Sequence, residues 1–168
     1  MTGNRPVCLS CGMNAPPAAV LRETWDERLA PSEGCRQLSM QVLAREFTDP
    51  ACFAVHRLTV AAYTLQHPFS VKPHSLAIHL VALCLSLEAS RPQHLIGTQM
   101  VRAAARLRAQ PPGRLQPPEH RGALTVAEVV GAESAQEHCL RVRDWAVEVW
   151  AAWQAHHDRV HSWVAAVD

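Results

Sequence analysis

Residues 49–68 read DPACFAVHRLTVAAYTLQHP and carry the clearest helix signals of the chain. Asp49 suits the N-cap position, because its carboxylate can accept a hydrogen bond from the first turn, and Pro50 suits the first helical position. The residue before a proline is pushed out of the helical region, so Pro68 ends the helix. The stretch therefore predicts one helix from Pro50 to about Gln66.

Similar start and stop signals recur on both sides of this stretch. Further helices are expected over Cys35–Phe47, from Ser75, from the capping box Ser90–Gln93, over Thr125–Gly131, and from the capping box Ser134–Glu137 through Val164. No alternation of apolar and polar residues indicates a strand. We therefore expect an all-α fold, an antiparallel bundle of about five helices with a zinc-knuckle-like N-terminal arm.

The N-terminal stretch differs from the rest of the chain. It contains Pro16-Pro17 and Pro31, which favour loops and leave room for at most a short helix between Val20 and Leu29. With 168 residues the chain has the size of one domain that can bury a core. We expect a single helical domain, residues 1–168, with a loop-rich metal-binding arm at residues 1–34 and the bundle at residues 35–168.

The composition excludes several classes of protein. Hydrophobic residues make up 48% of the chain and charged residues 18%, which is unlike a disordered protein. The net charge of +1 argues against nucleic acid as a partner, because binding to phosphate backbones needs an excess of Lys and Arg. No apolar run is long enough to cross a membrane, and the N-terminus lacks the apolar run of a signal peptide. A soluble, cytoplasmic protein is expected.

Cys8-Leu9-Ser10-Cys11-Gly12 has the spacing of a metal knuckle. Two intervening residues let both sulfur atoms face one tetrahedral ion, and the following Gly12 permits the tight turn that aims backbone donors at the sulfurs. A redox pair would instead follow a core strand, and the residues before Cys8 do not form one. Zinc is the preferred interpretation, and two surface cysteines without a ligand are the other alternative.

Cys35 is the third candidate ligand. It lies in the turn at a helix start, where the positive end of the helix dipole favours a thiolate. Cys52, Cys84 and Cys139 fall inside predicted helices and are interpreted as buried thiols. No second close cysteine pair exists, so the fourth ligand is expected from one of the ten histidines.

His67 is the preferred fourth ligand. It shares a helix face with His56, but eleven residues of helix separate the two imidazoles by roughly 16 Å, too far to share one ion. If the helix from Cys35 and the following helix pack antiparallel, His67 lies beside Cys35 and His56 at the far turn. His79 and His157 remain alternatives, and His67 can also be read as a helix cap at the negative end of the dipole.

His157 and His161 are four residues apart, a spacing at which two imidazoles on one helix face can bind a transition metal. A catalytic site would need a third ligand and an open position. A solvated helix end explains the same residues. Motifs for a serine nucleophile, a P-loop, a dinucleotide site or an HExxH zinc site are absent from the sequence.

Three parts of the chain together resemble a known family. They are the Cys8–Gly12 knuckle with Cys35, the segment Val55–Pro68 (VHRLTVAAYTLQHP), and Trp150-Ala151-Ala152-Trp153 before His156. The chain is similar over nearly its whole length to a family of uncharacterised bacterial proteins, a domain of unknown function. The resemblance implies no reaction, but it supports a bacterial source and one site made of Cys8, Cys11, Cys35 and His67.

The sequence thus predicts one metal-binding site and leaves two classes of function open. The first is a zinc-stabilised helical module, holding Zn²⁺ as its cofactor, that binds an unknown protein partner or a small ligand. The alternative is a metal-dependent enzyme, a hydrolase or thiol-transfer protein with a histidine site in the bundle. A closed site of four protein ligands indicates the first, and three ligands plus a water indicate the second.

Overall fold

The computed structural model describes residues 7–14, 30–88 and 93–167. Over these ranges the chain forms eight α-helices, two 3₁₀-helices and no strand, with an isolated bridge between Val7 and Asn14. The prediction of an all-α fold is confirmed for the described residues, but five helices is too low a number. The helices are α1 (Glu33–Thr48), α2 (Pro50–Phe53), α3 (His56–Gln66), η1 (Pro68–Ser70), α4 (Pro73–Leu87), α5 (Gln93–Ala109), α6 (Val126–Val130), α7 (Ala135–Ala152), η2 (Gln154–His156) and α8 (His157–Ala165).

Two expectations lie outside the described residues: the short helix between Val20 and Leu29, and the first residues of the capping box at Ser90. None of the helices in the described ranges has both the length and the apolar character needed to cross a membrane.

The stretch at residues 49–68 forms two helices where one was predicted. Asp49 caps α2 as expected, with its Oδ1 accepting from the backbone N–H of Ala51 at 2.9 Å. The helix then breaks at Val55, whose φ of −105° and ψ of 2° are not helical. The break turns the chain so that the Val55 side chain is buried and α2 contacts both α1 and α7. The predicted end at His67 is confirmed.

The prediction of a single long C-terminal helix through Val164 is also wrong. Trp153 ends α7, with its backbone N–H directed at the carbonyls of Val149 and Trp150, and a 3₁₀ turn leads into α8. Trp153 and Val160 are both fully buried. The turn allows α8 to fold back against α4, which buries more apolar surface than a straight helix extending into solvent.

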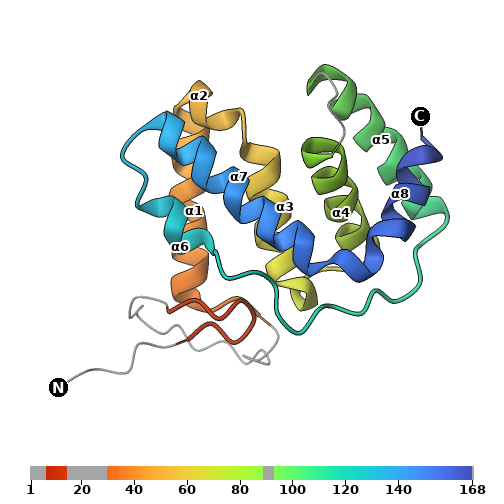
Figure 1. The fold of residues 1–168 in the computed structure, drawn as a ribbon, viewed down its shortest axis with the longest axis horizontal. Helices are drawn as coiled ribbons and strands as arrows, with labels where there is room; N and C mark the ends of the chain where they lie inside the picture. The colour runs from red at the N-terminus through yellow and green to blue at the C-terminus, as the bar shows by residue number, and fades with distance from the viewer. Residues whose placement is uncertain (1–6, 15–29, 89–92, 168) are drawn as a thin grey trace.

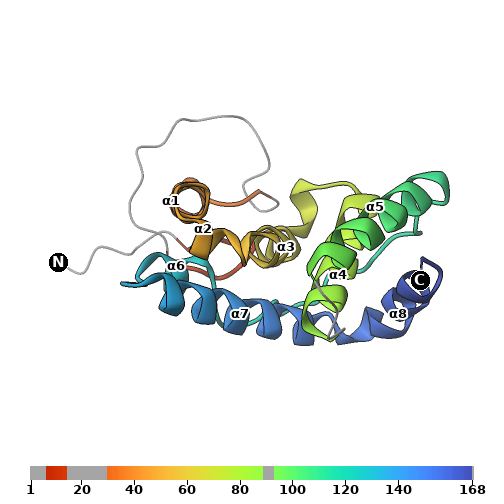
Figure 2. The same ribbon diagram turned by 90° about the horizontal axis from the view of Figure 1, so that it is seen from above.

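Helix α3 lies in the middle of the molecule and packs against α4 and α7 (Figure 1). Helices α1, α2 and α6 gather at one end, and α4, α5 and α8 at the other. Seen from above, α7 runs along one side and α1 lies on the opposite side of α2 and α3 (Figure 2). The largest fully buried hydrophobic side chains are those of Leu65, Leu80, Leu83, Leu85, Trp145 and Trp153.

Candidate metal centre and the adjoining cavity

Four side chains with metal-binding atoms meet where the N-terminal segment touches α1 and the end of α3. They are Cys8, Cys11, Cys35 and His67, and their ligand atoms all lie within 4.8 Å of one another. The Nε2 atom of His67 is 3.3 Å from the sulfur of Cys35 and 3.7 Å from that of Cys8. The sulfurs of Cys11 and Cys35 are 3.8 Å apart. The structure thus brings together all four residues chosen from the sequence.

The knuckle at Cys8 is a closed turn held by its own backbone. The N–H of Cys8 donates to the carbonyl of Met13 at 2.8 Å, and the N–H of Gly12 donates to the carbonyl of Cys8 at 2.7 Å. Gly12 has a φ of +78°, a left-handed conformation that costs other residues steric strain. This turn places Cys8 and Cys11 on the same side of the loop.

Cys35 is positioned by the start of α1. Ser32 is the N-cap, and its Oγ accepts from the backbone N–H of Cys35 at 3.2 Å. The backbone N–H of Ser32 in turn points at the sulfur of Cys8 at 3.4 Å. Donors of this kind stabilise negative charge on sulfur, so the helix start supports both thiolates.

His67 is held with one ring nitrogen free for a ligand bond. Its Nδ1 donates to the carbonyl of Tyr63 at 2.7 Å, which fixes the tautomer and leaves the lone pair of Nε2 facing the sulfurs. The side chain is 1% exposed, and the ring packs against Tyr63 with centroids 4.3 Å apart. This arrangement, in which one nitrogen is tied to a carbonyl, is the usual one for a metal-binding histidine.

The three thiols of the cluster differ in their pKa values. Hydrogen bonds from Cys11 and Cys35 hold the pKa of Cys8 far below its ordinary value. The bond from Cys35 lowers the pKa of Cys11, but the contact with Cys8 and burial outweigh it and raise that pKa to about 12. Contacts with Cys11 and Cys8 raise the pKa of Cys35 as well. Without a cation, therefore, the cluster favours a single thiolate.

A divalent cation would remove this conflict, because it can bind all three sulfurs as thiolates. Tetrahedral zinc with sulfur and imidazole ligands separates its ligand atoms by roughly 3.5–3.8 Å. Three of the six distances in the cluster, 3.3, 3.7 and 3.8 Å, are close to this spacing, and the other pairs lie within 4.8 Å. Thiolate and imidazole donors also suit zinc better than magnesium or calcium. The four residues therefore fit a metal ion.

Gln66 links the knuckle to the helices by hydrogen bonds, a role that the sequence does not reveal. Its carbonyl accepts from Ser10 Oγ at 2.9 Å, and its amide nitrogen donates to the carbonyls of Arg121 and Leu124 at 3.0 and 2.8 Å. Its amide oxygen accepts from Trp145 Nε1 at 2.9 Å. Gln66 thus joins the knuckle through its backbone carbonyl, and α7 and the segment before α6 through its buried side-chain amide.

Arg121 brings a positive charge to the same cluster. It donates to the carbonyl of Ser10 in the knuckle, and its guanidinium lies 5.4 Å from the ring of Phe69. Burial lowers the pKa of Arg121, while negative charge on Cys11 and Cys8 raises it. A site with three thiolates and a divalent ion carries a net charge of −1, which this arginine would balance.

The other candidate histidines lie elsewhere. His56, at the start of α3, has its Nδ1 2.7 Å from the carboxylate of Glu46. Glu46 is fully buried and also contacts Thr59 Oγ1 and, at 3.1 Å, His138 Nε2. His157 stacks on Trp150, 3.7 Å between centroids, outside the cluster. The role of Glu46 is not visible in the sequence, since its letter alone does not distinguish a buried carboxylate from a solvated one.

His79, the other alternative for the fourth ligand, lies on α4 and is likewise outside the cluster. Burial lowers its pKa to about 4, so the imidazole is neutral at physiological pH. His157 and His161 do not form the pair that their spacing allows. Their ring centroids are 6.1 Å apart, and Nε2 of His157 is 2.9 Å from the carbonyl of Trp150.

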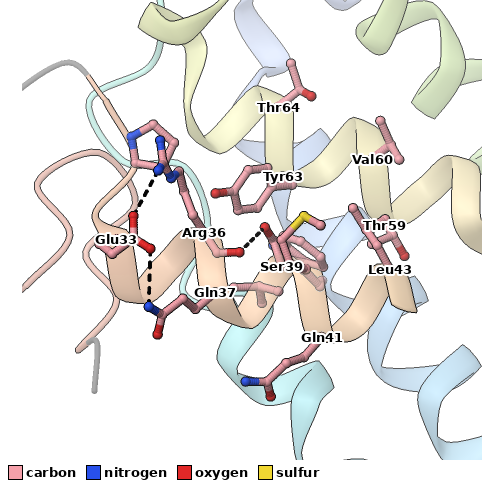
Figure 3. A pocket seen from close by; sticks show the side chains of 14 residues that line it. Glu33, Arg36, Gln37, Ser39, Gln41, Leu43, Thr59, Val60, Tyr63 and Thr64 are labelled. Carbon is pink, nitrogen blue, oxygen red and sulfur yellow. Dashed lines mark hydrogen bonds and ion pairs between the residues drawn. The ribbon is translucent and has the colours of Figure 1, made fainter. Parts of the chain in front are cut away.

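A large cavity lies between α1 and α3, next to the Cys₃His cluster (Figure 3). Its volume is about 760 Å³, and its lining surface is mostly apolar. Val126 of α6 and Trp145 of α7 complete the lining. Glu33 forms an ion pair with Arg36 at 2.9 Å among the lining residues. Small-molecule sites typically have volumes of about 300–1,000 Å³ and a few polar groups in an apolar lining.

Tyr63 connects this cavity to the candidate metal centre. Figure 3 shows its side chain reaching from α3 toward Arg36 and Ser39 on α1. Its hydroxyl is buried beside Ser39 and Cys35, without a hydrogen bond of normal geometry to either. Burial raises the pKa of Tyr63, so the hydroxyl stays protonated. The same ring packs against His67, so Tyr63 lies between the cavity and the cluster.

The described residues therefore define an all-α domain with a Cys₃His cluster that can hold a metal ion. Residues 6–154 match a family of unknown function, DUF5946, and the chain belongs to this family. The match includes all four residues of the cluster and confirms the resemblance found in the sequence. Neither a curated protein nor a solved structure matches the chain.

Proposed function

We propose that this protein is a zinc-stabilised helical module that binds a small, largely apolar molecule in the cavity between α1 and α3. The observation that carries the proposal is the cluster of Cys8, Cys11, Cys35 and His67, whose ligand atoms lie within 4.8 Å of one another. Four protein ligands around one ion leave no open position, so the ion would be structural.

Burial supports a structural role for the metal. Cys8 and Cys35 are fully buried and His67 is 1% exposed, so water and substrate have little access to an ion between them. The ion would add a direct link between three segments that are otherwise held together by hydrogen bonds such as those of Ser10 with Gln66 and of Ser32 with Cys8: the knuckle, the start of α1 and the end of α3. Its binding energy would then count directly toward folding.

The cavity supports the binding role. An apolar ligand would gain from burial against α1 and α3, and polar lining side chains such as Gln41 and Thr64 offer it hydrogen bonds. We therefore expect a ligand with an apolar body and at least one polar group. The alternative occupant is an amphipathic helix of a protein partner, which would use the same apolar surface.

Metal analysis of the purified protein tests the first half of the proposal. About one zinc per chain is expected, and Cys11→Ser should lower that content while leaving the helix content largely intact. Cys139→Ser is the matched control, because this thiol lies on α7 and contacts the carbonyl of Ala51, far from the cluster. Purified protein without metal, or equal losses in both variants, would contradict the zinc site.

A fluorescent apolar probe, anilinonaphthalene sulfonate, tests the second half. The probe should bind the folded protein with a stoichiometry near one, and Val60→Trp should weaken binding by narrowing the cavity. Val101→Trp is the control, because Val101 lies on α5 with 71% of its surface exposed. Equal probe binding in both variants would refute the cavity as the site. Binding of an amphipathic peptide but not of the probe would favour a protein partner.

A further inference from the structure

A second cluster of ligand-type side chains lies at the opposite end of the molecule, between α4 and α8. Cys84, Glu88 and His161 place their ligand atoms within 4.8 Å of one another. Nε2 of His161 is 2.7 Å from Oε2 of Glu88, and the sulfur of Cys84 is 3.6 Å from the same oxygen. Three different donor types, thiol, carboxylate and imidazole, therefore converge on one point.

The helices explain why these residues meet. Cys84 and Glu88 are four residues apart at the end of α4, so both face the same side of that helix. His161 comes from α8, which packs against α4 after the turn at Trp153. The convergence thus depends on the break between α7 and α8, and a single long helix would have carried His161 away.

Glu88 is oriented by a residue that is not part of the cluster. Its second oxygen, Oε1, accepts from Trp150 Nε1 at 2.8 Å. Because that bond uses one carboxylate oxygen, Oε2 is the oxygen that faces Cys84 and His161. A tryptophan or backbone donor on the outer oxygen of a carboxylate is the kind of support that metal-binding carboxylates usually have.

We propose that Cys84, Glu88 and His161 form a second site for a divalent transition metal such as zinc, with one coordination position open to water. A zinc ion would separate the oxygen and nitrogen by roughly 3.3 Å, so the present 2.7 Å contact must widen by about 0.6 Å as the ion replaces the shared proton. Small rotations of two side chains accomplish this.

Exposure distinguishes this site from the buried cluster. The side chains of His161 and Glu88 are 47% and 41% exposed, whereas Cys84 is buried beneath them. A metal held by these three groups would therefore face solvent on one side. Three protein ligands plus a water is the coordination of catalytic zinc, in which the metal lowers the pKa of the bound water.

His157 supplies a matched control within the same helix. It precedes His161 by one turn, but its Nε2 is 2.9 Å from the carbonyl of Trp150 and its ring stacks on that indole. It is therefore a neighbouring imidazole that the proposal does not use. A metal that bound only to surface histidines would depend on both residues alike.

The proposal is tested by titrating cobalt(II) into the full-length protein under reducing conditions and counting bound metal. We expect the wild-type protein to bind one more equivalent than His161→Gln, and Glu88→Gln to weaken that equivalent at least tenfold. His157→Gln should bind it within about twofold of wild type. Because the readout is a difference between variants, it does not depend on whether the Cys8 cluster holds a metal.

Cys84→Ser separates this site from a histidine–carboxylate pair that binds metal without sulfur. The variant should lose the thiolate-to-cobalt charge-transfer absorption of the added equivalent, with its circular dichroism unchanged. An added equivalent that keeps this absorption in Cys84→Ser would overturn the assignment of sulfur. If His161→Gln binds as much cobalt as the wild type, or if His157→Gln loses as much as His161→Gln, the proposed site is overturned.

Discussion

The two ends of α3 each carry a histidine, and each histidine meets a different kind of partner. His67, at the C-terminal end, faces the sulfur of Cys35 at 3.3 Å. His56, at the N-terminal end, contacts the carboxylate of Glu46 at 2.7 Å. Both partners belong to α1, Cys35 to its first turn and Glu46 to its last. The antiparallel packing of α1 and α3 therefore gives each imidazole its own partner.

The chemistry of the partners sets what each end can do. The His67 end gathers three thiols and an imidazole with a free Nε2, so it favours a cation that lets all three thiols ionise. The His56 end already pairs its carboxylate with two imidazoles and a hydroxyl. A buried charge needs such partners, and Glu46 has them without a metal. Two histidines on one face of α3 thus belong to two different sites.

Removing the metal should separate the two ends most strongly. If the ion is structural, chelation should lower the melting temperature by roughly 10 °C or more, since several kcal/mol of binding energy are lost at about 2–4 °C per kcal/mol. Differential scanning calorimetry before and after chelation measures this change. Hydrogen exchange should show lost protection in the knuckle around Cys8 and retained protection near His56.

If metal removal is verified and the melting temperature is unchanged, the ion adds nothing to the stability of the fold. Equal loss of protection at both ends of α3 would show that the helix responds as one unit, and the contrast between its ends would then have no energetic meaning.

Glu46→Ala should give the next largest effect, at the opposite end of α3. It would leave His138 fully buried with neither ring nitrogen bonded, because Nδ1 already has no partner among the described residues. Leaving a buried hydrogen-bonding group without a partner typically costs about 1–3 kcal/mol, and the lost packing of the side chain adds to this. Urea unfolding should show a loss of this size, while the metal content stays at the wild-type level. A loss below about 1 kcal/mol, or a loss of metal, would count against two independent ends.

His67→Ala should weaken metal binding without a comparable loss of helix. Removing one of four ligands is expected to lower metal affinity by at least the 10- to 100-fold typical of supporting residues. Competition with a chromogenic chelator measures the change. His67→Cys is the control, because it restores a soft donor at the same place and should recover much of the affinity. No recovery would indicate that the imidazole, rather than any fourth ligand, is required.

Local sequence signals predicted most helix ends well. Asp49, Thr125 and Ser134 cap helices, and Pro68 follows the end of α3, because capping and proline geometry depend only on nearby residues. The breaks at Val55 and Trp153 were not predicted. Each one exists because the chain beyond it buries apolar surface against a helix distant in sequence, and no local pattern records that.

The candidate site shows the same division. The spacing of Cys8 and Cys11 and the antiparallel pairing of two helices were enough to choose the four residues that the structure brings together, and their metal ligation stays a prediction. The roles of Gln66 and Glu46 depend on partners up to 79 and 92 residues away. Such contacts are created by the fold, so a single sequence does not reveal them.

His56→Ala is the matched partner of His67→Ala and should have the smallest effect on zinc binding. His56 shares a face of α3 with His67, but its neighbours are the Glu46 carboxylate and the stacked ring of Phe53, 5.0 Å away between centroids. Losing a hydrogen bond to a buried charge should cost about 1.5–3 kcal/mol, and His138 and Thr59 still pair with Glu46. Zinc retention should therefore stay within about twofold of wild type. Zinc transfer to a chromogenic chelator, measured side by side in the two variants, decides the comparison. Equal retention in both, or a greater loss in His56→Ala, would show that the imidazole at the thiol end is not the fourth ligand.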